Sequence, residues 1–284
     1  MKTPKRIQPL IDEGLVDEVM RQLMSGKEAT VYVVRCGEEI RCAKVYKAAN
    51  ERSFHQAVAY QEGRRVKNSR QARAMEKGTR YGRKMAEEVW QNAEVDALYR
   101  LASAGVRVPT PFICFEGVLL MELVTGADGN AAPRLNDVAL TREQALVFHA
   151  ALLHQVVLML CAGVIHGDLS EYNILVDAHG PVIIDLPQAI DAAGSSVASS
   201  MLERDVDNLA TFFSAFAPEL AASKYGKEIW ALYHAGLLTP ESVLTGRVAA
   251  PTRAADVGAV IHEIALAREE EAERQAYRRL RDEM

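Results

Sequence analysis

Three polar residues, a His, an Asp and an Asn, precede a stretch that the sequence predicts to be a buried strand. The segment HGDLSEYNILV, residues 166–176, contains Asp168 and Asn173 five positions apart and then continues into apolar residues. A second acidic position, Asp185 in PVIIDLPQAI, follows after the length of one hairpin. Gly, Asp, Ser and Asn favour turns, which accounts for the glycine and the serine of this segment. A turn does not account for the spacing of the carboxylates and the amide, so these residues are candidates for a chemical site.

Phosphoryl transfer from ATP needs residues of these types. It requires oxygen ligands for a metal ion, a carboxylate that orients the attacking hydroxyl, a cation at the phosphates, and a loop that approaches them. Asp168 is the candidate for the orienting carboxylate, and Asn173 and Asp185 are candidates for the metal ligands. Mg²⁺ prefers hard oxygen donors and keeps several waters, so one amide and one carboxylate with the ATP phosphates are sufficient. The sequence therefore predicts a site for ATP with Mg²⁺ (or Mn²⁺).

The remaining requirements are met earlier in the chain. Lys44, in CAKVYK, lies on a predicted strand, where alternation places it on the same face as Cys42 and Tyr46. That face must look onto the core or onto the nucleotide. Glu94, within a predicted helix, is a partner of the kind that orients a nucleotide-binding lysine. The segment SGKEATVY lies between two predicted strands as a phosphate-covering loop should, although Gly26 is its only glycine where the common protein-kinase loop has three.

These positions need a framework of strands and helices. Partly alternating runs at 18–24, 29–36 and 40–47 predict strands, and the last two form a hairpin. From Arg83 an apolar face with helical spacing predicts a helix that stops at Gly105. A second hairpin follows over 111–124, and a cluster of Gly, Asp and Pro at 125–133 marks a boundary.

The second half reads differently. Thr141 with Gln144 predicts a capping box for a long helix that ends near Gly163. A short strand, the polar segment and a hairpin that turns at 178–180 come next, and everything past Leu202 reads as helix. The fold class predicted is α+β and two-lobed, like a protein kinase. An N-terminal lobe, residues 1–122, has an antiparallel sheet and one main helix. A mostly helical C-terminal lobe, residues 123–284, carries the polar hairpin.

Composition limits the class of protein. The chain has 284 residues, 49% of them hydrophobic, and a formal net charge of -5, which argues against general affinity for nucleic acid. A basic insertion at about 47–84 is either a solvated segment or a contact surface for RNA or an acidic partner. The start lacks the pattern of a signal peptide, and the apolar stretch 151–165 is too short to span a bilayer. We therefore expect a soluble, cytoplasmic protein with no membrane contact.

Four motifs in order resemble one known family. SGKEATVYVV, CAKVYK, HGDLSEYNILV and VIIDLPQAI together are similar to the RIO family of atypical serine/threonine protein kinases. The resemblance runs from about Leu10 to Phe213. It implies that Asp168 is the catalytic base, that Asn173 and Asp185 bind the metal, and that Lys44 contacts the phosphates with Glu94 as its partner. The further positions that it implies are the phosphate loop and the backbone that meets adenine, namely Ser25, Gly26, Lys27, Glu28, Glu122 and Val124.

The resemblance also implies how such a protein acts. Position 167 is Gly rather than the Arg that reads a phosphorylated activation loop, and no A-P-E segment follows Asp185, so control by an activation loop is not expected. Members of this family phosphorylate themselves on serine, and their protein substrates are uncertain. An ATPase switch that acts on a macromolecular partner, a ribosome-related contact, and transient phosphorylation of Asp185 are consistent with the family.

Two rival interpretations follow from the same motifs. Small-molecule kinases that phosphorylate aminoglycosides or choline also combine HGDL with N-I-L and an I-D pair. Tyr172 before Asn173 and the GKEATVY loop favour the RIO interpretation. A scaffold that binds nucleotide without catalysis is disfavoured because every polar position is intact. Around the site, His166 is expected to be satisfied by backbone, and Asp205, with Asp207 as the alternative, to accept backbone N–H groups of the loop.

Overall fold

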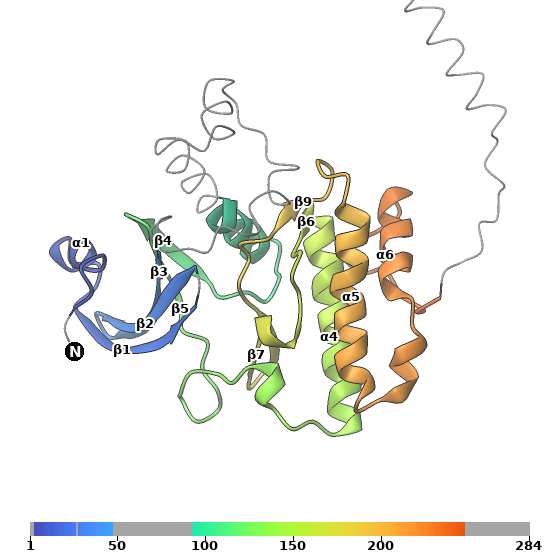
Figure 1. The fold of residues 1–284 in the computed structure, drawn as a ribbon, viewed down its shortest axis with the longest axis horizontal. Coiled ribbons are helices and arrows are strands. Elements are labelled where there is room, and N and C mark those ends of the chain that lie inside the picture. The colour runs from blue at the N-terminus through green and yellow to red at the C-terminus, as the bar shows by residue number, and fades with distance from the viewer. Residues whose placement is uncertain (1–2, 27, 48–92, 248–284) are drawn as a thin grey trace, which may run out of the picture. The chain divides into compact units, whose positions relative to one another are not determined.

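The computed structural model describes residues 3–26, 28–47 and 93–247. They form an antiparallel sheet in the N-terminal part and a mainly helical C-terminal part, so the α+β class is confirmed (Figure 1). Lys27, the basic insertion beyond Lys47, and the charged tail beyond residue 247 lie outside the described residues. The predictions made for these segments therefore stay predictions.

A single five-stranded sheet forms the N-terminal part. The strand order is β1-β2-β3-β5-β4, and all neighbouring strands are antiparallel. The elements of this part are α1 (Gln8–Asp12), β1 (Glu18–Ser25), β2 (Ala29–Cys36), β3 (Glu39–Tyr46), β4 (Pro111–Phe115), β5 (Val118–Glu122) and a helix over residues 93–103. The two predicted hairpins, β2–β3 and β4–β5, are confirmed. Both turn at a glycine with positive φ, Gly37 (63°) and Gly117 (74°), a conformation in which a Cβ is unfavourable.

The two faces of the sheet bury different side chains. Successive residues of a strand point to opposite faces. Along β3, Ala43 and Val45 pack with α1 in a cluster that covers one face. Tyr46 points the other way and joins the main core together with the helix at 93–103. Lys44 therefore points toward that helix, as alternation predicted.

The described residues of the C-terminal part form three α-helices, three short 3-10 helices and two small strand pairs. Its helices contact one another, and Figure 1 shows them side by side. The elements are η2 (Leu135–Asp137), α4 (Arg142–Cys161), β6 (Val164–Ile165), η3 (Glu171–Asn173), β7 (Ile174–Asp177), β8 (Gly180–Ile183), β9 (Ile190–Asp191), α5 (Ala198–Ser214), η4 (Pro218–Ala222) and α6 (Tyr225–His234). The capping box of α4 is confirmed, because Gln144 N donates to Thr141 Oγ1 and Thr141 N donates to Gln144 Oε1.

Two expectations about the C-terminal part need correction. The chain past Leu202 is not helical throughout, because residues 235–247 follow α6 without a helix. Gly236 has a φ of 69° and Pro240 lacks an N–H, and both oppose a continued helix. The strand β9, which pairs with β6, was not predicted, because two residues are too few to show a pattern.

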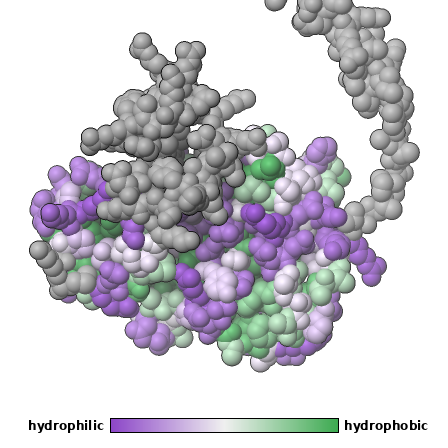
Figure 2. Space-filling model, viewed as in Figure 1, coloured by the Kyte–Doolittle hydropathy of each residue, from purple (hydrophilic) through white to green (hydrophobic). Residues whose placement is uncertain are grey.

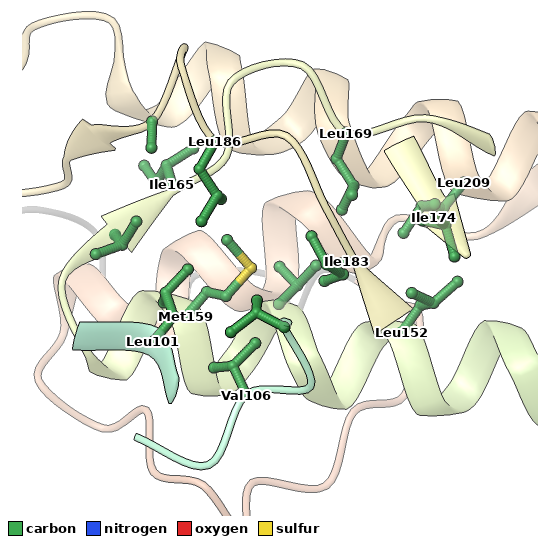
Figure 3. Packing of buried hydrophobic residues seen from close by; sticks show 14 of the residues in the cluster. Leu101, Val106, Leu152, Met159, Ile165, Leu169, Ile174, Ile183, Leu186 and Leu209 are labelled. Atoms are coloured by element: carbon green, nitrogen blue, oxygen red, sulfur yellow. The ribbon is translucent and has the colours of Figure 1, made fainter. Parts of the chain in front are cut away.

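The apolar stretch 151–165 falls largely within α4, the long helix that the sequence predicted. Among the described residues, α4 is the one helix long and apolar enough to cross a membrane. Half of that apolar window is nevertheless buried, and Leu152 and Met159 belong to the same core cluster as Ile183 and Leu209 (Figure 3). This packing accounts for the apolar composition of α4.

The face drawn in Figure 2 carries hydrophilic side chains around smaller apolar areas.

A buried histidine in this core makes stability depend on pH. His149 is 2% exposed, and its ring lies 5.6 Å from the rings of both Phe213 and Tyr225. Burial lowers the pKa of His149 from 6.5 to about 4. The unfolded chain therefore takes up a proton between these values and the folded chain does not, so stability is complete above pH 6.5 and falls as the pH drops toward 4.

We predict that His149 contributes about 2 kcal/mol to the loss of unfolding free energy between pH 7 and pH 5. Urea unfolding of the wild type and of His149→Leu at both pH values measures this contribution. The loss of unfolding free energy should be smaller in the variant than in the wild type by about 2 kcal/mol, because the other titrating groups are common to both proteins. Equal losses in the two proteins would contradict the prediction.

Candidate active site

Three charged side chains that are distant in sequence meet beneath β3. Lys44 Nζ lies 2.5 Å from Glu94 Oε1 and 2.8 Å from Asp185 Oδ1. Lys44 comes from β3, Glu94 from the helix at 93–103, and Asp185 from the segment that follows β8. Lys44 and Glu94 are 8% and 4% exposed, whereas the Asp185 side chain is 47% exposed. The structure therefore brings together three of the residues that the sequence singled out.

Electrostatic interactions favour the charged forms of Lys44 and Asp185. Burial by itself would lower the pKa of Lys44, but the negative charges of Glu94 and Asp185 outweigh burial and raise it well above its usual value. Burial would raise the pKa of Asp185, but the Lys44 ammonium beside it outweighs that effect and holds the pKa below its usual range. At neutral pH the site thus presents a fixed cation next to a carboxylate that remains available to another cation.

A pocket opens beside these charges. It is lined by the three charged residues and by apolar neighbours, namely Leu98, Pro109, Leu119, Met121, Ile184 and Leu186. Leu119 and Met121 come from β5, and Leu98 comes from the helix at 93–103. Pro109 lies shortly before β4, and Ile184 and Leu186 follow β8. A pocket lined by apolar side chains and a few charged groups suits a ligand that combines an apolar ring with an anionic group, as a nucleotide does.

The two residues expected to meet adenine, Glu122 and Val124, come shortly after the pocket residue Met121 in the chain. Glu122 comes next after Met121, and its N–H donates to the Thr110 carbonyl over 2.9 Å. The Val124 carbonyl accepts from the Ala132 N–H, also over 2.9 Å. The Glu122 carbonyl and the Val124 N–H are then the acceptor and the donor that a purine edge requires. Their contact with a base stays a prediction.

The predicted phosphate loop is the turn between β1 and β2. Gly26 and Glu28 lie in it, and Ser25 is the last residue of β1. Lys47 Nζ donates to the Gly26 carbonyl over 2.6 Å and to Ser25 Oγ over 3.2 Å. The contact of Lys47 with this loop was not predicted from the sequence. The signal lies in the register of the β2–β3 hairpin, which places Lys47 opposite Glu28, where its N–H bonds the Glu28 carbonyl over 2.8 Å.

The polar loop after β6 is held from below by α5. Asp205 Oδ2 accepts from the Gly167 N–H over 2.7 Å, and its Oδ1 accepts from the Leu169 N–H over 3.0 Å. Burial raises the pKa of Asp205. His166 Nε2 lies 3.1 Å from the Ile184 carbonyl, so its ring is satisfied by backbone. The predictions for Asp205 and His166 are confirmed.

Asp168 projects from this anchored loop toward solvent. Its neighbour Leu169 is fully buried and points into the core, as Figure 3 shows. Asp168 itself is exposed. Its carbonyl accepts from Asn173 Nδ2 over 2.8 Å, and its carboxylate oxygen Oδ2 lies 3.4 Å from Gln188 Nε2. Gln188 was not singled out from sequence, because its contact with Asp168 crosses from one segment to another.

The oxygen donors of Asn173 and Asp185 fit a hard divalent metal. Ile184 N donates to the Asn173 carbonyl over 3.0 Å, which extends the β7–β8 pairing by one position and places Asp185 directly after it. Because Asn173 Nδ2 is bonded to Asp168, the amide oxygen points away from that bond. No cluster of three or more His, Cys, Asp or Glu side chains capable of holding a metal occurs among the described residues. Phosphate oxygens and water would complete the coordination.

Two residues of the site have backbone conformations that favour glycine. Gly167 has a φ of 81°, and a Cβ there would lie 2.5 Å from Met201 Cε and 2.7 Å from the Gln188 carbonyl oxygen. Asp185 has a φ of 68° although it carries a side chain. Strain of this kind persists where surrounding contacts fix the residue, and it is common at functional sites. For Asp185 the contact with Lys44 is one such constraint.

The fold and the site define a two-lobed kinase with a lysine–glutamate pair and a hairpin that carries the candidate metal ligands. A family model described as RIO domain matches residues 30–225. The RIO-type serine/threonine-protein kinase Rio1 of Haloferax volcanii is 33% identical over 213 residues, which cover 73% of this chain and 67% of the relative. The serine/threonine-protein kinase rio1 of Dictyostelium discoideum is 31% identical over 72% of this chain and 34% of its own length. The human serine/threonine-protein kinase RIO1 is 30% identical with the same coverage.

This chain belongs to the RIO family of serine/threonine-protein kinases. The expectation from the four sequence motifs is thereby confirmed. The chain spans two thirds of the archaeal relative and about a third of the Dictyostelium and human relatives. The relatives' full lengths therefore include segments without a counterpart in the matched region.

We predict that Gly167→Ala destabilises the protein and disorders the loop that carries Asp168. The added methyl group must displace the Gln188 backbone as well as a flexible methionine end, and the left-handed conformation adds about 1–2 kcal/mol. Thermal unfolding should show a lower Tm, and ATP turnover should fall. Gly129→Ala is the matched control, because Gly129 has a φ of 74° with nothing near its Cβ position. A smaller Tm decrease for Gly167→Ala than for this control would contradict the prediction.

Proposed function

We propose that this chain transfers the γ-phosphate of ATP to serine or threonine hydroxyls of itself or of a protein partner, with Mg²⁺ as the metal. The observation that carries the proposal is the contact of Lys44 with both Glu94 and Asp185 in the lining of the pocket. A structural salt bridge needs one carboxylate. Two carboxylates from separate parts of the chain, one of them half exposed, are suited to place a lysine and a metal ligand at the same phosphates.

Each residue has a role that follows from its position. The Lys44 ammonium binds phosphate oxygens, and Glu94 holds the ammonium in place from the helix side. The exposed Asp168 carboxylate orients the attacking hydroxyl and accepts its proton. Ser25 and Gly26 cover the phosphates from the β1–β2 turn, where Lys47 holds them. Glu122 and Val124 meet the base through their backbone.

Asn173 and Asp185 would hold the metal ion. A bound Mg²⁺ neutralises charge on the phosphates in the ground state and in the transition state. The fixed ammonium of Lys44 beside Asp185 limits the negative charge at the site, which leaves a need for phosphate oxygens among the ligands. Nucleotide and metal are therefore expected to bind together.

The proposal also includes the coupling of ATP turnover to a partner and the kind of partner. The family and the intact polar residues support turnover coupled to a macromolecular partner, as in an ATPase switch. The basic insertion at about 47–84 supports contact with RNA or a ribosome-related partner.

Self-labelling tests the proposal directly. Purified protein with radiolabelled ATP and Mg²⁺ should label itself on serine, and Asp168→Asn should lower the rate by about 10²–10⁴-fold, because a positioned base contributes that much. ATP affinity of the variant should change little, since Asp168 does not line the pocket. A variant that turns over at the wild-type rate would remove Asp168 from the mechanism.

Acceptor dependence distinguishes the rival class. Added aminoglycosides or choline should leave ATP consumption unchanged, because a protein kinase does not use them as acceptors. A small-molecule kinase would behave oppositely, with turnover that is low until its acceptor arrives. Acceptor-stimulated turnover without self-labelling would overturn the proposed function.

The metal ligands are separable by mutation. Asp185→Ala should lose Mg²⁺-dependent ATP binding and turnover together, because it removes the one carboxylate ligand. Asn173→Ala should be milder, since a neutral amide contributes less to the binding of a cation. Calorimetric titration of each variant with ATP, with and without Mg²⁺, measures the effect. Unchanged metal-dependent affinity in Asp185→Ala would rule out Asp185 as a metal ligand.

A further inference from the structure

Asp168 has a side-chain neighbour that comes from outside its own loop. Gln188 Nε2 lies 3.4 Å from Asp168 Oδ2. Gln188 follows Asp185 by three positions, so the same short segment carries a metal-ligand candidate and a contact to the candidate base. The distance is long for a hydrogen bond, which is common for catalytic contacts before substrate binds.

The backbone around Gln188 is fixed on both sides. Leu186 and Ala189 are 2% and 8% exposed and belong to the core, and the Ala189 N–H bonds the Leu186 carbonyl over 3.1 Å. Figure 3 shows Leu186 pointing into the cluster below. The side chain of Gln188 is only partly exposed, and it leaves this turn on the side of Asp168.

The segment is also packed against the loop that carries Asp168. The Gln188 carbonyl oxygen would lie 2.7 Å from a Cβ at Gly167, so the two backbones approach as closely as a glycine allows. Gly167 N is bonded to Asp205, which fixes the loop from the opposite side. Gln188 and Asp168 are thus held at a defined separation by contacts that do not involve either side chain.

We propose that Gln188 is a positioning residue for Asp168. Its amide N–H holds Oδ2, and Oδ1 is left to accept the proton of the attacking hydroxyl. In that step the hydroxyl oxygen bonds to Pγ, the bond from Pγ to the ADP oxygen breaks, and the proton moves to Oδ1, from which water takes it after product release. The inference deepens the proposed function and rests on it.

The chemistry explains why a neutral donor suits this place. An exposed Asp168 carboxylate can rotate about its staggered side-chain torsions, and a bond to one oxygen selects an orientation. A lysine or arginine would also orient the carboxylate, but its positive charge would favour the ionised form and weaken the base. An amide orients the carboxylate at a smaller cost in basicity.

Two variants of Gln188 test the inference in the full chain. In Gln188→Ala, kcat for self-labelling should fall about tenfold while KM for ATP stays within about twofold, because Gln188 does not line the nucleotide pocket. In Gln188→Glu, the acidic limb of the pH–rate profile should move up by about one pH unit. Two adjacent carboxylates resist being ionised together, so the variant requires a higher pH to free the base.

Gln22→Glu is the matched control. Gln22 is an exposed residue in the middle of β1, opposite Tyr32, and the same change of charge there should leave kcat and the pH profile unchanged. Thermal unfolding of the Gln188 variants distinguishes a purely structural role, which would lower Tm without moving the acidic limb.

The outcomes separate the inference from the proposed function. A tenfold lower kcat in Gln188→Ala together with a shifted limb in Gln188→Glu supports the inference. Wild-type kcat in Gln188→Ala, or an unmoved limb in Gln188→Glu, overturns it while self-labelling by the wild type still supports the kinase. A wild-type protein that does not label itself contradicts the proposed function first.

Discussion

The rest of the structure depends on a lysine ammonium that is buried beneath a sheet. A charge in that position is unfavourable unless opposite charge lies beside it, and removing one partner of a buried pair typically costs about 3–5 kcal/mol. Lys44 obtains its compensation from Glu94 on one side and from Asp185 on the other. Because these carboxylates come from the helix at 93–103 and from the segment that follows β8, a single electrostatic requirement joins the sheet to the part of the chain that carries the candidate metal ligands.

The loop with Asp168 depends on a second set of contacts, which are hydrogen bonds between α5 side chains and the loop backbone. Asp205 accepts two of its N–H groups, Asn208 Nδ2 donates to the Leu169 carbonyl over 3.0 Å, and Arg204 donates to the Gly167 carbonyl. The loop backbone is therefore satisfied by α5 and does not need substrate to hold it. A rigid backbone with an exposed carboxylate is what a proton acceptor in a phosphoryl transfer requires.

The departure from ordinary protein kinases at position 167 has a packing reason. Those kinases carry an arginine there that reads a phosphorylated loop. In this chain the position has a positive φ and lies against Met201 and the Gln188 backbone, so no side chain fits without displacement. The glycine thus lacks the side chain for such a regulatory contact, and it allows the segment that follows Asp185 to approach closely. That segment supplies Gln188, whose Nε2 lies 3.4 Å from Asp168 Oδ2.

The sequence by itself determined the local features. Period-2 and helical patterns located the five strands of the sheet and α4, the Thr141–Gln144 pair marked the start of α4, and motif spacing identified Lys44, Asp168, Asn173 and Asp185. These follow from neighbours in the chain, which a pattern can show. Only the tertiary structure decided which distant groups meet: the double contact of Lys44, the position of Lys47 at the phosphate loop, Gln188 against Asp168, the end of helix after α6 and the pairing of β9 with β6. Such contacts depend on hairpin register and on how segments pack across the core, and neither is encoded in any single short stretch of residues.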